Sequence, residues 1–276
     1  MPSGTLESPI EDITEFNEKV EIKSDDLDCI TILTAVKGLH NFLPLWLMNI
    51  RHQQYPQDKI TVIVDECECD ESFIDNEYHC KAMLYPAKLK VMRHKETLSM
   101  GEKRNRLVDA CETDVFCFME ADDMYQPNHL IYSRWMMKEH KKGSVASLDL
   151  IFAFPEHKKK PYAMSYNKDL TGFPNVSTMM MTKELFSKTK GFKHIDVCED
   201  FQVWDGVKDD VFHTEVINQS LCIVHKDKRI NMEHCLREET LCKDANIDGG
   251  LKDFLDCILR ISRDDKDTSS TDLNID

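Results

Sequence analysis

Short continuous runs of apolar and β-branched residues alternate along this chain with segments of helical spacing. No other feature restricts its fold as strongly. The runs at 29–36, 59–64, 89–92 and 115–119 predict strands, and the segments at 42–53, 102–111 and 128–141 predict helices. Strands that alternate with helices form βαβ units. We therefore expect an α/β fold whose mainly parallel central sheet is flanked by helices and buried on both faces.

The two ends of the chain differ from this alternating region. Residues 1–27 are polar and acidic and predict an N-terminal extension, while 241–276 predict a C-terminal helix followed by a disordered acidic tail. No signal peptide is recognisable, and no apolar run reaches the roughly 18 residues that span a bilayer. The 11 cysteines form no CxxC pair, and several lie in apolar runs, as buried thiols do. These features predict a cytoplasmic protein without a transmembrane segment.

The charge balance excludes one class of partner. The formal net charge is −15, whereas binding to nucleic acid needs a basic surface. We therefore expect no nucleic-acid partner. A small phosphate ligand remains compatible with this charge, because a metal ion and a few local cations can hold a diphosphate inside an acidic protein.

Carboxylates gather directly after two of the predicted strands. The second strand is followed by Asp65 and Asp70, and the fourth by the segment Glu120-Ala121-Asp122-Asp123. Ligands of parallel sheets bind beyond the carboxyl ends of the strands, where these segments should meet. Hard cations such as Mg²⁺ and Mn²⁺ bind carboxylates and share them with substrate phosphates. The pattern indicates a metal-bound diphosphate. Alternatively, the aspartates at 122 or 123 cap a following helix, and those at 65 and 70 form ordinary turns.

A predicted helix start carries several cations. Gly101 is followed by Lys103, Arg104 and Arg106. Because a helix N-terminus with nearby cations attracts anions, the segment predicts an anion site. The alternative is a solvated basic helix face.

These segments, in this order, resemble family 2 glycosyltransferases of the GT-A (Rossmann-like) fold. The resemblance covers roughly residues 28–240, which we expect to form the glycosyltransferase domain. It rests on the segments 31–35, 54–56, 62–65 with Asp70, 101–105, 119–127, 191–192 and 199–204.

The resemblance implies a donor site for a nucleotide sugar. Thr34 would lie beneath the nucleotide, and Asp65 would contact its base or ribose. Lys103 would lie near the diphosphate, Arg104 near the diphosphate or the base, and Asp123 near the sugar.

It also implies a metal site and a base. Asp122 would be the main ligand of Mn²⁺ or Mg²⁺, with Glu120 at the first position of the motif. His234 would complete the set, with His225 as the alternative, unless each is a loop imidazole without a ligand role. Asp200, in the pair Glu199-Asp200, would be the catalytic base.

The implied activity is inverting, metal-dependent transfer of a single sugar. The donor would be a nucleotide sugar, with a UDP-sugar as the leading candidate. The acceptor would be a glycan, a protein or a small molecule. One position departs from the pattern, since Glu120 replaces an aspartate and reaches further by one methylene. Trp204 is followed by Asp205, and the arginine-tryptophan motif of processive members is not evident. Both points favour single-sugar transfer. The alternatives are a sugar nucleotidyltransferase, a degenerate nucleotide-sugar-binding protein and a two-carboxylate glycosidase.

Overall fold

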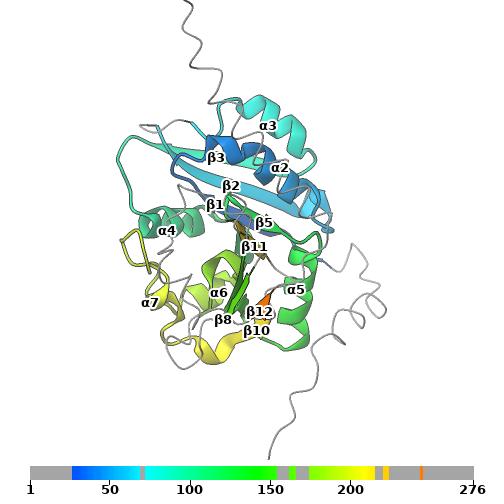
Figure 1. Cartoon of the computed structure of the whole chain (residues 1–276), viewed down its shortest axis with the longest axis vertical. Coiled ribbons are helices and arrows are strands. Elements are labelled where there is room, and N and C mark those ends of the chain that lie inside the picture. Colours follow the sequence, from blue (N-terminus) through cyan, green and yellow to red (C-terminus); the bar gives the residue numbers. More distant parts are fainter. Residues whose placement is uncertain are drawn as a thin grey trace, which may run out of the picture.

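The computed structural model describes residues 27–68, 72–153, 162–165, 174–214, 220–223 and 243–244. Within these residues the strands form two sheets (Figure 1). The larger sheet has the spatial order β10 (Val211–Thr214), β6 (Ser144–Ser147), β9 (Met180–Thr182), β4 (Val115–Phe118), β1 (Ile30–Ala35), β2 (Ile60–Cys67) and β3 (Lys88–His94). The smaller sheet has the order β12 (Lys243–Asp244), β8 (Tyr162–Ser165), β7 (Asp149–Ala153), β11 (Ser220–Ile223) and β5 (Asp123–Tyr125).

In sequence order, helices alternate with the strands, and they pack on the two faces of the larger sheet. They are α2 (Leu43–Arg51), α3 (Glu77–Leu84), α4 (Met100–Ala110), α5 (His129–Glu139), α6 (Lys183–Phe186) and α7 (Phe201–Trp204). Short 3₁₀ turns are η2 (His40–Phe42), η3 (Gln57–Lys59), η5 (Val176–Thr178) and η6 (Lys208–Asp210). The helix α4 begins at a capping box in which Ser99 and Glu102 bond reciprocally.

The predicted mainly parallel sheet is confirmed. Strand β1 pairs in parallel with both β2 and β4, and β2 pairs in parallel with β3. One strand departs from this pattern, because β9 lies antiparallel between β4 and β6. The predicted helices correspond to α2, α4 and α5, each within a few residues of its expected bounds.

Two hydrophobic cores cover the two faces of the larger sheet. Alternate residues of a strand point to opposite faces, and Ile32 and Leu33 accordingly enter different cores. The first core contains buried residues of α2, α3 and α5, and the second those of α4, α6 and α7. Both faces of β1 are therefore buried, which explains its continuous apolar sequence.

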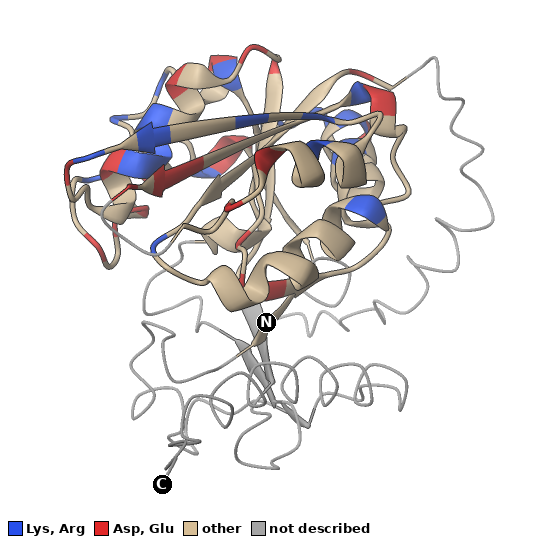
Figure 2. Ribbon diagram, turned by 90° about the horizontal axis from the view of Figure 1, so that it is seen from above, with Lys and Arg blue, Asp and Glu red and all other residues tan. Residues whose placement is uncertain are grey.

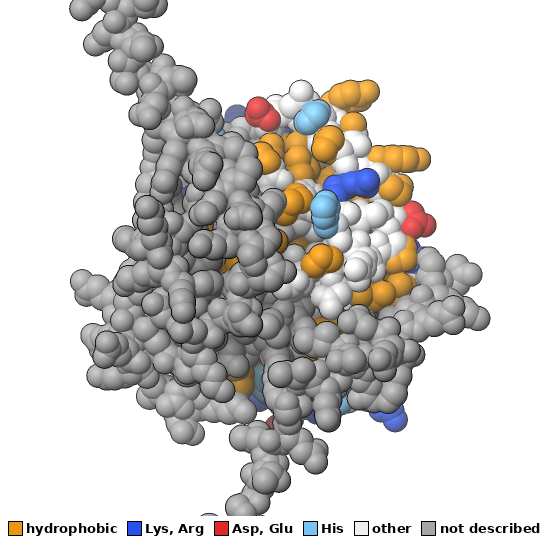
Figure 3. Space-filling view, turned by 45° about the vertical axis from the view of Figure 1, so that its right-hand side comes forward, with side chains coloured by type: hydrophobic (Ala, Val, Ile, Leu, Met, Phe, Trp, Pro, Cys, Tyr) orange, Lys and Arg blue, Asp and Glu red, His pale blue; other side chains and the backbone are white. Residues whose placement is uncertain are grey.

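The surface is mixed in character. Figure 2 shows basic and acidic residues interspersed along the helices and strands. On the face in Figure 3, hydrophobic side chains lie in small groups among histidine and basic side chains, an ordinary pattern for a protein surface. Within the described residues, no helix has the length and apolar character needed to cross a membrane.

Candidate active site

The carboxyl ends of β1, β2 and β4 bring the acidic segments to one edge of the sheet. Ala35, the last residue of β1, pairs with Asp65 of β2. Just beyond β4, the Met119 amide donates to the Leu33 carbonyl at 3.1 Å, and the next residue is Glu120. The sheet itself therefore places Asp65 and the 120–122 turn on either side of β1.

The 120–122 turn is fixed from below by buried polar side chains. The Tyr125 hydroxyl accepts from the Glu120 amide at 2.8 Å and donates to the Ser177 carbonyl at 3.0 Å. Asn49 of α2 donates to the Asp123 carbonyl and accepts from the Tyr125 amide. The turn leads into β5, and α5 begins only at His129. The alternative in which Asp122 or Asp123 caps a helix is therefore wrong.

Arg104 links this turn to the predicted base segment. Its Nη1 lies 2.9 Å from Glu120 Oε1 and its Nε 3.0 Å from Glu199 Oε1. The guanidinium also lies 5.0 Å from the ring centre of Phe118 and 5.8 Å from that of Phe192. The two carboxylates raise the pKa of Arg104 above its usual value, against the opposing effect of burial. Arg104 thus contacts Glu199, which lies 95 positions further along the chain.

Asp200 lies next to this ion pair, at the start of α7. The Trp204 Nε1–H donates to its Oδ2 at 3.4 Å. Burial and the neighbouring Glu199 charge raise the pKa of Asp200 to about 6, while Arg104 opposes the rise. A carboxylate with such a pKa is ionised at neutral pH and still basic enough to accept a proton.

Helix α4 holds the segment that carries this base. A Cβ on Gly101 would lie 1.7 Å from the Lys193 carbonyl oxygen, so only glycine allows this approach. Asn105 donates to the Phe192 carbonyl and accepts from its amide, each at 2.8 Å. Gly191 has φ +71°, a conformation that favours glycine.

The N-terminus of α4 is occupied by the protein itself. The Met100 amide donates to Asp196 Oδ1 at 3.1 Å, and the Gly101 amide donates to the Ile195 carbonyl at 3.1 Å. Ser99 Oγ accepts from the next amide, that of Glu102. The expected anion site at this helix start is therefore closed by oxygens of the chain.

Asp65 is fully buried and held on two sides. Its Oδ2 accepts from Arg106 Nε at 3.0 Å, and His94 Nε2 lies 3.2 Å from Oδ1. The His94 contact is not aligned as a hydrogen bond, so its contribution is electrostatic. Burial raises the pKa of Asp65, and Arg106, His94 and Lys103 oppose that rise.

Two further residues that were predicted to bind the nucleotide sugar, Thr34 and Lys103, are buried near the end of β1. The Thr34 hydroxyl donates to the Met119 carbonyl at 2.9 Å and accepts from Trp46 Nε1 at 3.0 Å. Lys103 is 1% exposed, and its Nζ donates to the Val36 carbonyl. Both side chains fix the strand ends. This differs from the expected diphosphate contact by Lys103, and the expected place of Thr34 beneath the nucleotide stays a prediction.

The described residues do not complete a metal site. Nowhere in the described ranges do three Asp, Glu, His or Cys side chains gather as metal ligands. Glu120 is paired with Arg104, and Asp123 Oδ1 accepts from the Ile223 amide at 3.3 Å. Asp122 is buried and stays the main candidate ligand. His234 and His225 lie outside the described residues.

Sequence reasoning missed the residues that support the site. They include Tyr125 and Asn49 beneath the turn, and His94 beside Asp65. Polar residues inside otherwise apolar segments were the available signal, since buried polar groups need partners. Which partner each one takes depends on the tertiary fold.

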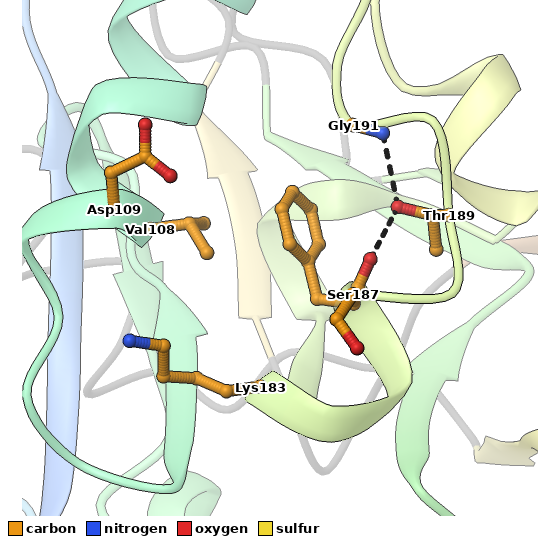
Figure 4. Close-up of a pocket in the computed structure, with 7 residues that line it drawn as sticks. Val108, Asp109, Lys183, Ser187, Thr189 and Gly191 are labelled. Carbon is orange, nitrogen blue, oxygen red and sulfur yellow. Dashed lines mark hydrogen bonds between the residues drawn. The ribbon is translucent and has the colours of Figure 1, made fainter.

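A separate pocket lies between α4 and α6 (Figure 4). Its volume is about 320 Å³, and it is lined by Val108, Asp109, Lys183, Phe186, Ser187, Thr189 and Gly191. None of the predicted donor, metal or base residues lines it. It is therefore distinct from the candidate active site.

Comparison with known proteins agrees with the fold described above. The fold is similar to that of the mannosyltransferase PcManGT from Pyrobaculum calidifontis, solved with GDP-Man and Mn²⁺, with a TM-score of 0.58 and 15% identity over 76% of this chain. This chain spans 61% of that protein. S. aureus TarS 1–349, solved with UDP, gives a TM-score of 0.55 and 14% identity over 91% of this chain and 76% of its own. No curated protein matches.

The sequence profile named glycosyl transferase family 2 matches residues 40–198, which is more than half of the chain. The match includes α4 and the 120–122 turn. The first of the paired acids, Glu199, lies just beyond its end. With the GT-A fold and the strand-end site in place, the chain belongs to glycosyl transferase family 2 and is a glycosyltransferase.

Proposed function

We propose that this glycosyltransferase moves a single sugar from a nucleoside diphosphate sugar to an acceptor hydroxyl, with inversion at the anomeric carbon. The observation that carries the proposal is the half-buried Asp200, whose pKa is raised to about 6. Asp200 takes the proton of the acceptor hydroxyl while that oxygen attacks the anomeric carbon from the side opposite the leaving diphosphate. A base so placed contributes about 10²–10⁴-fold to the rate.

Arg104 supports this chemistry by holding the base in place relative to the turn that follows β4. It binds Glu199, next to the base, and Glu120, on the donor side, through contacts of 3.0 and 2.9 Å. Because it is buried between two carboxylates, its charge neutralises them instead of facing solvent. The base is thereby held at a fixed place relative to the turn that follows β4.

We propose that the activity depends on a metal ion bound by Asp122, with His234 as the first candidate for a second protein ligand. The described residues fit a divalent cation only in part, because Arg104 already pairs with Glu120. A bound Mn²⁺ or Mg²⁺ would neutralise charge on the diphosphate as a Lewis acid. PcManGT was solved with GDP-Man and Mn²⁺, and TarS with UDP and with UDP-GlcNAc. These complexes support a nucleotide-sugar donor, for which we propose a UDP-sugar.

The acceptor is proposed as a glycan, a protein or a small molecule with a free hydroxyl. A cytoplasmic location is proposed from the buried thiols of Cys80, Cys111 and Cys117. Cys67 departs from the expected thiol usage, because it is disulfide-bonded.

A panel of nucleotide sugars, with and without Mn²⁺, tests the function. A donor at 100 times its dissociation constant should stabilise the fold by about 2.7 kcal/mol in a thermal-shift assay. Turnover should release a nucleoside diphosphate, whereas a nucleotidyltransferase would release pyrophosphate, and NMR of the product should show the inverted anomer. Asp200→Asn should bind the donor and lose turnover. A wild-type chain that responds to no nucleotide sugar would refute the proposal.

A further inference from the structure

The pocket between α4 and α6 has an apolar surface in its interior. Its volume of about 320 Å³ falls within the range of about 300–1,000 Å³ that is usual for small-molecule sites. The buried Val108 and the half-buried Phe186 supply the apolar surface. Phe186 is fixed by edge-to-face packing on Phe116, with ring centres 5.7 Å apart. The pocket therefore presents a preformed apolar surface to a ligand.

The pocket also contains a carboxylate that the protein does not use. Asp109 lines it from the second half of α4 and is exposed. Within the described residues its carboxylate makes no hydrogen bond or ion pair. In Figure 4 it lies on the same side of the pocket as Lys183, yet the two charges form no ion pair with each other. Because an ionised carboxylate can only accept hydrogen bonds, a ligand at this point must donate.

The ammonium group of Lys183 keeps donors for a ligand. Its Nζ donates to the Cys111 carbonyl at 2.6 Å, which fixes the side chain. An ammonium has three donors, and no other group of the described residues accepts from it. On the opposite side of the pocket in Figure 4, the Ser187 hydroxyl donates to the Glu184 carbonyl at 2.7 Å, so it presents acceptor lone pairs. A ligand must therefore accept from Lys183 and donate to Asp109 and Ser187.

We propose that this pocket is a second sugar site, which binds a neutral sugar unit away from the donor site. Every sugar hydroxyl can both donate and accept, as Asp109, Lys183 and Ser187 together require. The C–H face of the sugar ring packs on Val108 and Phe186.

Other ligand classes fit this pocket less well. A ligand with a single charge meets a like charge at Asp109 or at Lys183, and an apolar ligand covers both groups without offering either a partner. A zwitterion matches both charges. However, Asp109 is exposed and Lys183 already binds a carbonyl oxygen, so both groups need hydrogen bonds more than counter-charges. This favours the neutral sugar.

NMR titration of methyl-labelled protein with glucose, mannose, N-acetylglucosamine and phenylalanine, the last as a zwitterion with an apolar ring, tests this inference. At least one sugar should bind at millimolar concentration and shift the methyl signals of Val108. UDP in excess should leave that binding unchanged, because none of the predicted donor residues lines the pocket. Asp109→Ala and Lys183→Met should each weaken it by about tenfold or more, because each removes a hydrogen bond to a charged group. Asp109→Ala, an exposed substitution that favours helix, covers the case in which Lys183→Met does not fold.

Lys188→Met is the matched control. Lys188 follows α6, pairs with Glu184 at 3.1 Å and does not line the pocket, so this variant should bind the sugar like the wild type. Trisaccharides of the same sugars distinguish the two sources of the ligand: a unit of a glycan chain should bind at least as tightly as the free sugar, whereas a site for free sugars should reject the chain.

The inference fails if no sugar binds, if phenylalanine binds more tightly than every sugar, if UDP displaces the sugar, or if both pocket variants bind it like the wild type. None of these results removes the response to nucleotide sugars, on which the proposed function depends.

Discussion

Replacing Gly101 with alanine should misplace the base while leaving most of the fold intact. The added Cβ would lie 1.7 Å from the Lys193 carbonyl oxygen and 3.2 Å from Glu199 Cβ, whereas ordinary contact begins at 3.4 Å. The nearest atom belongs to the backbone, so a rotamer change cannot relieve the clash. The segment from Lys193 to Asp200, which is closed by the Lys193 amide donating to the Glu199 carbonyl, must therefore move away from α4.

The two effects of this substitution on stability oppose each other. Overpacking costs about 1–3 kcal/mol, while alanine in place of glycine inside a helix gains about 0.5–1 kcal/mol. The net loss should be about 0–2.5 kcal/mol. The effect on turnover should be larger, because a catalytic group displaced by about 1 Å costs on the order of 100-fold. Donor affinity should stay near wild type, since α4 keeps its contacts with β1 and β2.

Thermal unfolding, donor titration and initial rates should be measured on the same preparation. Gly143→Ala is the control, because its Cβ would meet the flexible side chain of Leu185, nearest at 2.9 Å, away from the base. That variant should turn over like the wild type. If Gly101→Ala is folded and keeps the wild-type rate, the close approach of α4 does not position the base.

Four further predictions concern the base and the α4 side chains that hold its segment. Since the pKa of Asp200 is raised to about 6, kcat/KM should rise with pH up to about 6 and then level. For the same reason its ionisation costs stability above that pH, so Asp200→Asn should unfold at a higher temperature than wild type at pH 7 while losing turnover. Arg104→Met should cost about 3–5 kcal/mol in denaturant unfolding, because it leaves the buried Glu199 and the partly buried Glu120 without their cation, and adding Glu120→Gln and Glu199→Gln should recover part of that loss. Asn105→Ala should cost about 1–3 kcal/mol, because it leaves the Phe192 amide and carbonyl unpaired, and Asn105→Asp, which keeps only the acceptor, should fall between, as unfolding curves would show.

The sequence predicted the strands that are buried on both faces, because their apolar runs are continuous. It did not predict α3, where only Cys80 and Leu84 are buried, so the helical period is weak. It also missed β9, whose three residues are too few to show a period. The antiparallel insertion of β9 depends on pairing with β4 and β6, which no local pattern records.

The position of the candidate site was predictable from the sequence, whereas the ion-pair partners of its side chains were less so. The ends of parallel strands meet by topology, so the approach of Asp65 and the 120–122 turn followed from the strand order. The partners of Arg104 did not, because Glu199 lies 95 residues further along the chain. Ion pairs of this kind are chosen by tertiary packing, and the roles of these residues in catalysis stay predictions.

Residues 101–106 of α4 account for why these contacts occur together. Successive helical residues point about 100° apart, so neighbours in sequence face different elements. Gly101 and Asn105, four apart on one face, hold the segment that carries the base, and Lys103 bonds the end of β1. Arg104 joins the two acidic segments, while Arg106 covers Asp65 at the end of β2. A shift of this helix would therefore move the base, the β4 turn and the end of β2 at once, so substitutions that tilt α4 should lower donor affinity and turnover together, whereas Gly101→Ala should lower turnover alone.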